Sequence, residues 1–321
     1  MRLLVTGVSG FAGTTLAREL LAAGHEVFGT TRTGNTPGRP APPLDGDHLF
    51  VATLDDAARI AEVVRAVQPD GLFHLAGFTN PAASFNDPAA AYAANLHGSL
   101  HVFAATAALR RPCRVVWVGS SAVYGHVEPN ETPVTETNPF RPLSPYAVSK
   151  AAADLAAYQW SHTHALDIVR MRPFNHTGPG QDPLYVCSDF ARQLVAVEYG
   201  HQPAQVEVGN LDVRRDFTDV RDIVRAYALA RERATAGEAY NVCSGVPRSA
   251  REILDTLIRL SGLEVRIVVR PERRRRVDVP LLVGSPAKLS AATGWAPRTD
   301  WEQTLRDLLA YWRRRLATKQ R

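Results

Sequence analysis

Residues 3–13 read LLVTGVSGFAG, and this stretch decides the fold. Its apolar start predicts a short strand, and three glycines then follow in the spacing GxxGxxG ahead of a helical segment. Glycines allow a tight turn, a close approach of the backbone to a pyrophosphate, and close packing of helix against strand. The amino terminus of the helix adds free N–H groups and a positive dipole end. The stretch therefore predicts a dinucleotide-binding turn formed by Gly7, Ser9, Gly10, Phe11, Ala12 and Gly13.

Apolar strands alternate with helical stretches through the first 170 residues. The predicted strands are Arg2–Val5, Glu26–Thr30, Leu72–Leu75, Val115–Val118 and Asp167–Arg172. The predicted helices between them are Gly13–Ala23, Asp55–Val67, Ala89–Leu109 and Pro145–His164. Such alternation is typical of a parallel sheet that is covered by helices on both faces.

The pattern becomes irregular after Arg172. Turn-rich segments there separate helices that we expect near Phe190–Tyr199, Ile223–Arg233, Ala250–Leu260 and Trp301–Arg314. We therefore predict the α/β class: a Rossmann-type doubly wound parallel sheet with a smaller α/β carboxy-terminal substrate lobe. The predicted division places a nucleotide-binding domain at residues 1–172, with a returning segment near 213–241, and a substrate domain mainly at 173–321. A length of 321 residues agrees with about two domains.

The composition is that of an ordinary globular protein. Hydrophobic residues make up 45% of the chain and charged residues 21%, and no apolar run approaches the ~18 residues of a membrane span. The amino terminus lacks the long apolar segment of a signal peptide. The three cysteines, Cys113, Cys187 and Cys243, form no CxxC pair, which disfavours a disulfide framework and a structural zinc site. We expect a cytoplasmic protein without a metal.

The net charge of +5 comes mainly from arginine, because only three of the 37 basic residues are lysine. Arginine can hold phosphate or carboxylate groups with a two-pronged fork. The basic runs Arg273–Arg276 and Arg313–Arg315 could suggest nucleic-acid binding, but no DNA- or RNA-binding motif accompanies them. We expect solvated helix ends or a small anionic ligand there, and neither nucleic acid nor a membrane as partner.

The end of the second predicted strand indicates which nicotinamide cofactor is used. An acidic residue about 20 positions past the glycines would bind the ribose 2′-hydroxyl of NAD, whereas an arginine there accommodates the 2′-phosphate of NADP. Arg32 lies 19 residues past Gly13, and no acidic residue occupies the position. The sequence thus favours NADPH, with NADH possible.

A tyrosine and a lysine stand four residues apart in the predicted helix Pro145–His164. Tyr146 and Lys150 therefore share one helix face, where the cation lowers the pKa of the phenol and allows proton exchange near neutral pH. Ser120 follows the predicted strand Val115–Val118, where its hydroxyl can reach a substrate oxygen. These three residues are the predicted catalytic group.

With these motifs the chain resembles the extended short-chain dehydrogenases/reductases that act on nucleotide sugars. The resemblance implies that Ser120 is the catalytic serine, Tyr146 the acid/base and Lys150 the lysine that binds the nicotinamide ribose. Asn95 resembles the asparagine of the active-site helix, while Thr53 departs from the aspartate that is usual near the adenine. Beyond the glycine-rich turn, the residues expected to contact the cofactor are Arg32, Leu54, Leu75, Ala76, Gly77, Tyr146, Lys150, Pro173 and His176.

Two positions help to choose the reaction within this family. Sugar-nucleotide 4,6-dehydratases carry a glutamate, often beside an aspartate, just before the tyrosine of their VYG-type motif, and these acids remove water. The corresponding residues here are Ala122 and Ser121, which cannot shuttle a proton. Simple hydride transfer needs no such acid, so the expected reaction is keto reduction or 4-epimerisation.

Longer strings resemble the GDP-4-dehydro-6-deoxy-D-mannose reductases. They are MRPFNHTGPGQ at 171–181, GNLDVRRDF at 209–217 and YNVCSG at 240–245. The resemblance implies a GDP-linked 4-keto-6-deoxyhexose as substrate, bound by Ser121, Asn175, Asn210, Arg215 and Arg275. The expected activity is NADPH-dependent reduction of GDP-4-dehydro-6-deoxy-D-mannose to GDP-D-rhamnose. Alternatives are a GDP-6-deoxy-talose-forming reductase, a 4-epimerase with tightly held NAD and, in a different class, a non-catalytic NADP- or nucleic-acid-binding protein.

The remaining polar residues carry weaker signals. We expect the pair His97 and His101 to be structural, because no third metal ligand accompanies their four-residue spacing, and we read His162 and His164 as surface residues. Two glutamates of a proline-rich loop, Glu131 and Glu136, are expected to be solvated charges. By resemblance, the helices near Ala89–Leu109 and Pro145–His164 would form a homodimer, with a tetramer left open.

Overall fold

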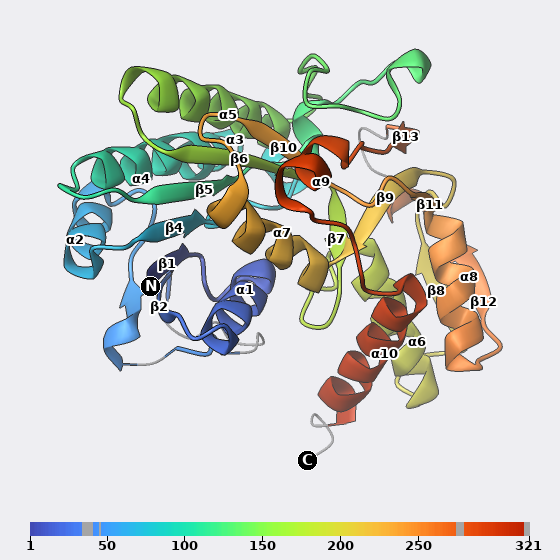
Figure 1. The fold of residues 1–321 in the computed structure, drawn as a ribbon. Helices are drawn as coiled ribbons and strands as arrows, with labels where there is room; N and C mark the ends of the chain where they lie inside the picture. The colour runs from blue at the N-terminus through green and yellow to red at the C-terminus, as the bar shows by residue number, and fades with distance from the viewer. Residues whose placement is uncertain (34–40, 45, 274–278, 318–321) are drawn as a thin grey trace.

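The computed structural model describes residues 1–33, 41–44, 46–273 and 279–317, and among these seven parallel strands form the central sheet. The strand order is β10-β6-β5-β4-β1-β2-β3 (Figure 1). The strands are β1 (Arg2–Thr6), β2 (Glu26–Thr31), β3 (Leu49–Val51), β4 (Gly71–His74), β5 (Arg114–Val118), β6 (Ile168–Pro173) and β10 (Ala239–Val242). An order of 3-2-1-4-5-6 is that of a dinucleotide-binding sheet, so the predicted Rossmann-type fold class is confirmed.

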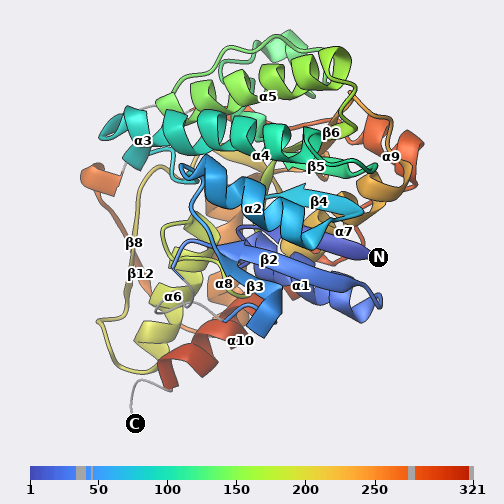
Figure 2. The same cartoon turned by 90° about the vertical axis from the view of Figure 1, so that its left-hand side faces the viewer.

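Helices cover both faces of this sheet (Figures 1 and 2). Helices α1 (Phe11–Ala22) and α7 (Val220–Arg233) pack on one face, and α2 (Ala57–Val67), α4 (Gly98–Ala107) and α5 (Pro145–Thr163) on the other. Strand β1 shows why, because successive side chains of a strand point to opposite faces. Leu3 and Val5 lie in the core beneath α1 and α7, while Leu4 lies in the core beneath α2 and α4.

The helix predicted at Ala89–Leu109 is not one regular helix. It consists of α3 (Pro88–Tyr92), a π-helical turn at Ala93–His97 and then α4. The Ser99 hydroxyl donates to the backbone oxygen of Asn95 at 2.6 Å, a bond to the preceding turn that competes with the regular helix ladder. Single π-turns inside helices occur often at functional sites, and this one contains Asn95.

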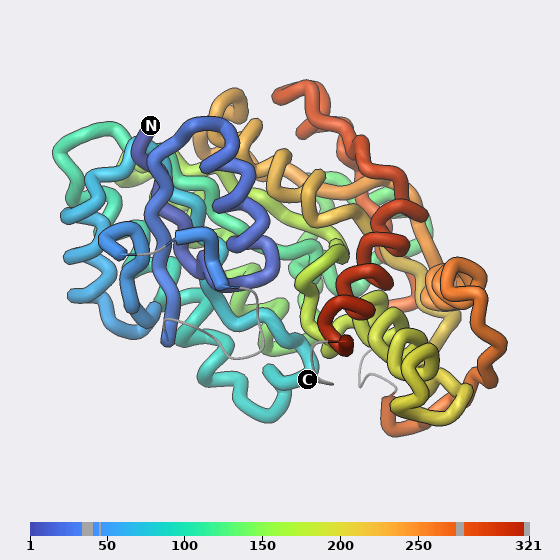
Figure 3. Tube along the Cα trace, turned by 90° about the horizontal axis from the view of Figure 1, so that it is seen from below, coloured from blue at the N-terminus to red at the C-terminus, as the bar shows by residue number. Residues whose placement is uncertain are grey.

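The carboxy-terminal lobe has its own core, and its helices lie beside one another in the Cα trace (Figure 3). Apolar faces of α6 (Val186–Glu198), α8 (Ala250–Ser261) and α10 (Trp301–Ala317) meet there. Helix α9 (Ala287–Thr293) packs instead against α7 and β10. The small strands of the lobe are β7 (Asn175–Thr177), β8 (Gln205–Val208), β9 (Arg214–Asp219), β11 (Pro247–Ser249), β12 (Arg266–Val269) and β13 (Leu281–Leu282). Strand β9 pairs with β7, β11 and β13, and β8 pairs with β12.

The chain crosses between the two parts more than once. After β9 in the lobe, α7 packs against α1, and β10 then adds to the central sheet beside β6. Strands β3 and β10, of three and four residues, were not predicted from the sequence. Helix α1 begins at Phe11, two residues earlier than predicted, because Gly10 is the last residue with an extended conformation.

A buried ionic cluster joins α5 to β6. Both oxygens of the Asp154 carboxylate are bound: Arg170 donates at 2.6 Å, and Arg172 donates through Nε at 2.8 Å and through a terminal nitrogen at 2.9 Å. All three residues are buried. Arg172 also donates to the Tyr124 hydroxyl and to the Glu136 backbone oxygen, each at 3.0 Å. The cluster therefore fixes the long connection after β5 to the underside of α5.

Candidate functional site

The predicted catalytic residues meet at the carboxyl edge of the central sheet. Ser120 follows β5, and Tyr146 and Lys150 lie in the first turns of α5. Ligands of open α/β sheets bind at this edge, at the point where the strand order reverses. In this sheet that point lies between the neighbouring strands β1 and β4. The structure thus brings together three residues that the sequence separates by up to 30 positions.

The Tyr146 phenol is held beside Ser120. The Ser120 hydroxyl hydrogen-bonds the phenol, which by itself lowers the phenol pKa. Burial outweighs this bond and, together with the nearby Tyr185, raises the pKa of Tyr146 to about 12. The expectation that the phenol pKa is lowered toward neutral is therefore wrong for this arrangement, because burial disfavours the charged phenolate. In the protein without its cofactor, Tyr146 is therefore a protonated group, ready to act as an acid.

Lys150 is a buried cation whose ammonium group contacts a backbone carbonyl and an aromatic ring. Its Nζ donates to the backbone oxygen of Val118 at 2.9 Å and lies 5.4 Å from the centroid of the Trp117 ring. Burial lowers the pKa of Lys150 to about 8. Among the described residues, no carboxylate forms an ion pair with it. Its charge is thus available to a neighbouring group rather than neutralised.

A short 3-10 turn, Ser121–Val123, follows Ser120. The Ser120 side-chain oxygen accepts a hydrogen bond from the Ala122 N–H at 3.1 Å, which caps this turn and fixes the serine. Ser121 is buried and Ala122 half-buried, and neither side chain is a titratable group. The positions of the dehydratase acids are therefore filled by a hydroxyl and a methyl group.

Asn95 organises the loop that follows β4. Its side-chain oxygen accepts from the Phe78 N–H at 2.9 Å, and its amide donates to the Phe78 backbone oxygen and to the Ser149 hydroxyl. Ser149 in turn donates to the backbone oxygen of Tyr146 at 2.8 Å. Gly77 packs against this amide, because a Cβ there would lie 2.5 Å from the Asn95 side-chain oxygen. Asn95 therefore connects the loop Leu75–Phe78 to the first turn of α5.

The glycine-rich turn has the geometry that a bound pyrophosphate requires. Gly7 has φ of +71°, and a Cβ on it would lie 2.8 Å from the Ala76 Cα. A Cβ on Gly13 would lie 2.2 Å from the Gly7 backbone oxygen, so α1 could not pack this closely with any other residue there. Gly10 caps α1 without a side-chain bond, which leaves N–H groups of the first turn for phosphate oxygens.

Residues of the lobe reach over this turn. The Phe11 and His176 rings stack with their centroids 5.9 Å apart and an angle of 7° between their planes. Pro173 is the buried last residue of β6, and His176 lies in the next strand, β7. A groove of about 20 Å³ lies between the start of α1 and the lobe, lined by Ser9, Gly10, Phe11, Thr14, Thr15, Arg18, Pro179 and Gly180.

The adenosine end of the predicted cofactor site lies beyond β2. Arg32 directly follows β2 and is exposed, while Ser9 is bonded to Thr31 at 2.9 Å. Leu54 packs against Gly98, where a Cβ would lie 2.7 Å from the leucine Cβ. The Thr53 hydroxyl bonds the Asp55 carboxylate, which lowers the pKa of Asp55. Thr53, which stands where the family usually has an aspartate, therefore hydrogen-bonds an aspartate two residues later in the chain.

The predicted substrate residues lie at different places in the lobe. Asn175 on β7 pairs with Phe217 on β9, and the half-buried Arg215 lies two residues earlier on the same strand. Arg215 donates to the Arg214 backbone oxygen at 2.9 Å. Asn210 is exposed in the loop after β8 and caps a turn by accepting from the Asp212 N–H. Arg275 lies outside the described residues.

Several side chains that organise the site were not predicted from the sequence. His74 and Ser99 hydrogen-bond each other at 3.1 Å, Ser84 accepts from the Tyr146 N–H at 3.1 Å, and the Tyr185 hydroxyl donates to the Thr79 backbone oxygen at 3.0 Å. Short-range patterns could not reveal them, since each partner is between 25 and 106 residues away. The one available signal was His74 itself, a polar residue at the end of an apolar strand.

The weaker candidates have structural explanations. His101 bonds the Leu54 backbone oxygen at 2.8 Å, His162 bonds the Tyr158 backbone oxygen, and His164 stacks on Trp160. The prediction that Glu131 and Glu136 are merely solvated was wrong. Glu131 forms an ion pair with Arg141 and, separately, a capping box with Glu128, and Glu136 accepts from the Asn241 N–H at 2.7 Å.

Three further observations concern chemistry and compartment. The three cysteines are free and buried. Within the described ranges, no group of three or more His, Cys, Asp or Glu side chains is arranged to hold a metal ion. None of the described helices has both the length and the hydropathy needed to cross a membrane.

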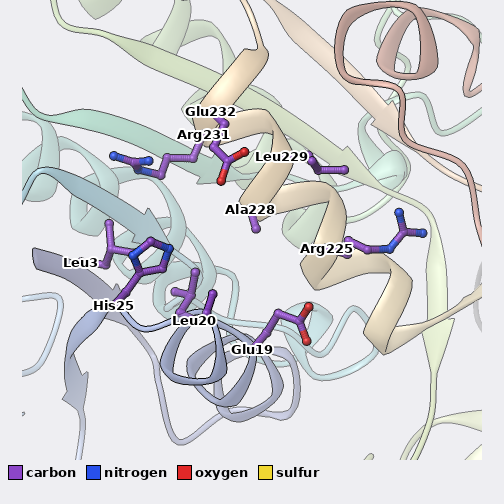
Figure 4. A pocket seen from close by; sticks show the side chains of 10 residues that line it. Leu3, Glu19, Leu20, His25, Arg225, Ala228, Leu229, Arg231 and Glu232 are labelled. Carbon is purple, nitrogen blue, oxygen red and sulfur yellow. The ribbon is translucent and has the colours of Figure 1, made fainter. Parts of the chain in front are cut away.

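A larger cavity of about 190 Å³ lies between α1 and α7 (Figure 4). Its lining includes Leu3 at the start of β1 and His25 just before β2, which places it at the amino-terminal edge of the sheet. The dinucleotide turn and Tyr146 are at the opposite edge. Its lining includes none of the residues predicted to bind cofactor or substrate, so it is separate from the site described above.

Comparison with known proteins places the chain in one family. The family model described as GDP-mannose 4,6 dehydratase matches residues 4–308. The GDP-6-deoxy-D-mannose reductase of Pseudomonas aeruginosa is 37% identical over 316 residues, which cover 98% of each chain. The structure of RMD from the same organism, complexed with NADPH, superimposes with a TM-score of 0.86 at 35% identity, again over 98% of each chain.

A structure with a different reaction is equally close in shape. The UDP-glucose 4-epimerase of Thermus thermophilus, in complex with NAD, has a TM-score of 0.87 at 29% identity over 98% of this chain and 99% of the epimerase. Fold similarity therefore leaves the reaction to the residues of the site. The resemblance inferred from the sequence is confirmed: the chain belongs to the GDP-mannose 4,6-dehydratase family, within the extended short-chain dehydrogenases/reductases.

Proposed function

We propose that the protein is an NADPH-dependent reductase that converts GDP-4-dehydro-6-deoxy-D-mannose to GDP-D-rhamnose. The observation that carries this proposal is the site itself. Ser120, Tyr146 and Lys150 meet at the sheet edge, while the positions of the dehydratase acids hold Ser121 and Ala122. Such a site can protonate a carbonyl oxygen but has no acid there to eliminate water. The 37% identity to a GDP-6-deoxy-D-mannose reductase supports the same substrate.

The chain's own residues fit the cofactor. Gly7 and Gly13 leave room for a pyrophosphate at the amino terminus of α1, and the exposed Arg32 can pair with a 2′-phosphate. Lys150 and the backbone of Leu75–Gly77 would hold the nicotinamide ribose. When bound, NADPH supplies the hydride that reduces C4 of the sugar. The structure of RMD from Pseudomonas aeruginosa with NADPH supports this choice over NADH.

Tyr146 supplies the proton. As the C4 carbonyl is reduced, its oxygen gains the electron pair of the former double bond and takes the phenolic proton of Tyr146. The hydrogen bond from Ser120 and the Lys150 charge stabilise the phenolate that remains. A proton from solvent restores the tyrosine. Reduction of the ketone to an alcohol is then balanced by one hydride and one proton.

We assign the binding of the two partners to the two parts of the chain. Residues 1–172, with the returning segment near 213–241, would hold the cofactor, and residues 173–321 would mainly hold the nucleotide sugar. Asn175 and Arg215 support the second assignment, since they lie on the paired strands β7 and β9. Asn210 and Arg275 complete the proposed substrate set.

The test is to follow NADPH absorbance with freshly prepared GDP-4-dehydro-6-deoxy-D-mannose, with NADH in a parallel assay. A stoichiometric loss of NADPH, faster than that of NADH, is expected, and NMR of the product would show GDP-D-rhamnose. Formation of the 6-deoxy-talose epimer would establish reduction but overturn the proposed stereochemistry. A product formed without added cofactor would instead indicate a 4-epimerase, the reaction of the Thermus thermophilus neighbour.

We further propose a homodimer that forms through α5 and acts in the cytoplasm. Val148, Leu155 and Tyr158 share one face of α5 and are exposed, Leu155 by 60%. Exposed apolar side chains on one helix face favour a protein partner. The proposed cytoplasmic location is supported by the three free cysteines, which fit a reducing compartment. Sedimentation should show a dimer, and Leu155→Lys should give a monomer; an unchanged dimer in the variant would exclude this face.

A further inference from the structure

His74, at the end of β4, links the two halves of the site through hydrogen bonds. One ring nitrogen, Nδ1, lies 2.7 Å from the Thr6 hydroxyl, and the other, Nε2, lies 3.1 Å from the Ser99 hydroxyl. All three side chains are buried. Thr6 directly precedes the glycine-rich turn, and Ser99 lies two residues after the end of the π-helical turn that contains Asn95.

The partners of Ser99 determine which nitrogen of His74 carries the proton. The Ser99 hydroxyl has a single hydrogen, and it donates that hydrogen to the Asn95 backbone oxygen at 2.6 Å. Ser99 also accepts from the Trp117 indole N–H at 3.0 Å. Toward His74, Ser99 can therefore act only as an acceptor. His74 must donate from Nε2.

The other nitrogen follows from this assignment. Burial and the nearby Lys150 charge lower the pKa of His74 to about 3, so the imidazole is neutral and Nδ1 is an acceptor. Thr6 donates to Nδ1 and accepts from the Ala76 N–H at 3.2 Å. Every hydrogen in the series then has one acceptor. The series runs from Ala76 through Thr6, His74 and Ser99 to the backbone of Asn95.

The series closes into a ring around the loop Leu75–Phe78. The loop is bound at Ala76 by Thr6 and at Phe78 by Asn95, whose amide also reaches Ser149 and thus the backbone of Tyr146. His74 is the member that joins the Thr6 side of this ring to the Asn95 side. The Thr6 side borders the proposed cofactor site, and the Asn95 side is hydrogen-bonded to the first turn of α5, which carries Tyr146.

We propose that His74 is a positioning residue that couples the cofactor-binding turn to the catalytic helix as a fixed Nε2–H imidazole. The proposal rests on the proposed reductase function. Its Thr6 bond sets the turn and the loop that would contact the nicotinamide ribose and diphosphate. Its Ser99 bond sets the turn of Asn95 and, through Ser149, the placement of Tyr146. The imidazole itself touches neither substrate nor cofactor.

Two substitutions separate the two bonds, because amide side chains can replace one ring nitrogen each. In His74→Asn the side-chain oxygen can take the place of Nδ1 and accept from Thr6, while the bond to Ser99 is lost. In His74→Gln the longer amide can take the place of Nε2–H and donate to Ser99, while Thr6 loses its acceptor. His74→Leu removes both bonds.

The experiment measures NADPH affinity from the fluorescence of the bound nicotinamide, and kcat and KM with saturating NADPH, for each folded variant. We expect His74→Asn to keep NADPH affinity within about threefold and to lose roughly tenfold or more in kcat, since a displaced catalytic group is costly. We expect His74→Gln to weaken NADPH binding by roughly tenfold with a smaller loss of kcat, since it leaves a buried hydroxyl unsatisfied. Ser99→Ala should resemble the first variant and Thr6→Val the second.

A matched control removes a buried hydroxyl elsewhere. Thr293 donates to the Leu289 backbone oxygen and accepts from the Trp295 N–H in α9 and the turn after it, so Thr293→Val should change stability alone. Equal losses of affinity and kcat in the Asn and Gln variants, or lower stability with unchanged constants, would overturn the proposal. NADPH affinity is measured without turnover, so a failure of the proposed reaction in the wild-type protein remains distinguishable from a failure of this coupling.

Discussion

Helix α5 carries two buried charged residues one turn apart, Lys150 and Asp154, and their surroundings differ. The Asp154 carboxylate is bound by Arg170 and Arg172 through three hydrogen bonds. Lys150 has a backbone oxygen and the Trp117 ring as neighbours, and among the described residues no carboxylate pairs with it. Asp154 is neutralised and joins α5 to β6, whereas Lys150 keeps an unbalanced charge at the site.

This difference distinguishes a buried charge that stabilises the fold from a buried charge that acts in the site. A neutralised buried ion contributes to the fold, and removing one of its partners is costly because the other charge remains buried. An unneutralised buried ion is unfavourable for the fold, but its field acts strongly on a neighbouring group. Substitutions near Lys150 should thus change the rate and spare stability, and substitutions at Asp154 should do the reverse.

The largest effect is expected at Tyr146. Tyr146→Phe removes the proton donor and keeps the ring, so kcat should fall by roughly 10²- to 10⁴-fold while NADPH affinity and the unfolding midpoint stay close to those of the wild type. Steady-state kinetics and NADPH titration measure both quantities. If cofactor affinity is lost along with turnover, Tyr146 is part of the binding site and not the acid.

Asp154→Asn sharpens the comparison from the structural side. Two arginines would remain buried without their counterion, so the free energy of unfolding should fall by about 3–5 kcal/mol. Urea unfolding followed by circular dichroism measures this loss. Kinetics of the folded fraction should be nearly unchanged. A large drop in kcat without a change in stability would show that the cluster belongs to the catalytic site.

The pH dependence tests the charge of Lys150. Because the pKa of Lys150 is lowered to about 8, its ammonium form predominates below that pH and is lost above it, while Tyr146 with a pKa of about 12 stays protonated. The value of kcat/KM should be level below pH 8 and fall by about tenfold per pH unit above it. Lys150→Arg, which keeps its charge, should remove this decline. A level profile of the wild-type enzyme to pH 10 would contradict the account.

The smallest effect is expected at Arg32, an exposed cation on the cofactor side. Arg32→Ala should raise the KM for NADPH by roughly 10- to 100-fold, the value of a charged hydrogen bond to phosphate, and leave the KM for NADH nearly unchanged. Parallel assays with the two cofactors give both constants. Equal changes for both would mean that Arg32 does not contact the 2′-phosphate.

The sequence was sufficient for the parts of the molecule that depend on local spacing. The glycines of residues 7–13 and the interval between Tyr146 and Lys150 are short-range patterns with a direct physical meaning. The fold class followed from the glycine-rich turn together with the alternation of predicted strands and helices. The structure places Ser120 beside Tyr146 as expected. Their roles stay predictions until the variants above are measured.

Other features depend on contacts that no local pattern contains. The alanine-rich segment around Asn95 has the composition of a regular helix, and its π-turn is accompanied by the bond from Ser99 and by the bonds of the Asn95 side chain to Phe78 and Ser149. Strand β10 reaches the central sheet from residues 239–242, after the chain has passed through the lobe. His74 and Asp154 acquire their meaning from partners 16 to 68 residues away.

The most direct test of the central claim follows one hydrogen atom. The enzyme would be given GDP-4-dehydro-6-deoxy-D-mannose and NADPH deuterated at the transferred position of nicotinamide C4, and the product examined by NMR and mass spectrometry. We expect one deuterium at C4 of GDP-D-rhamnose for each NADPH oxidised, with a rate that depends on Tyr146. A C4-epimerised product without deuterium, formed with no net oxidation of NADPH, would contradict it.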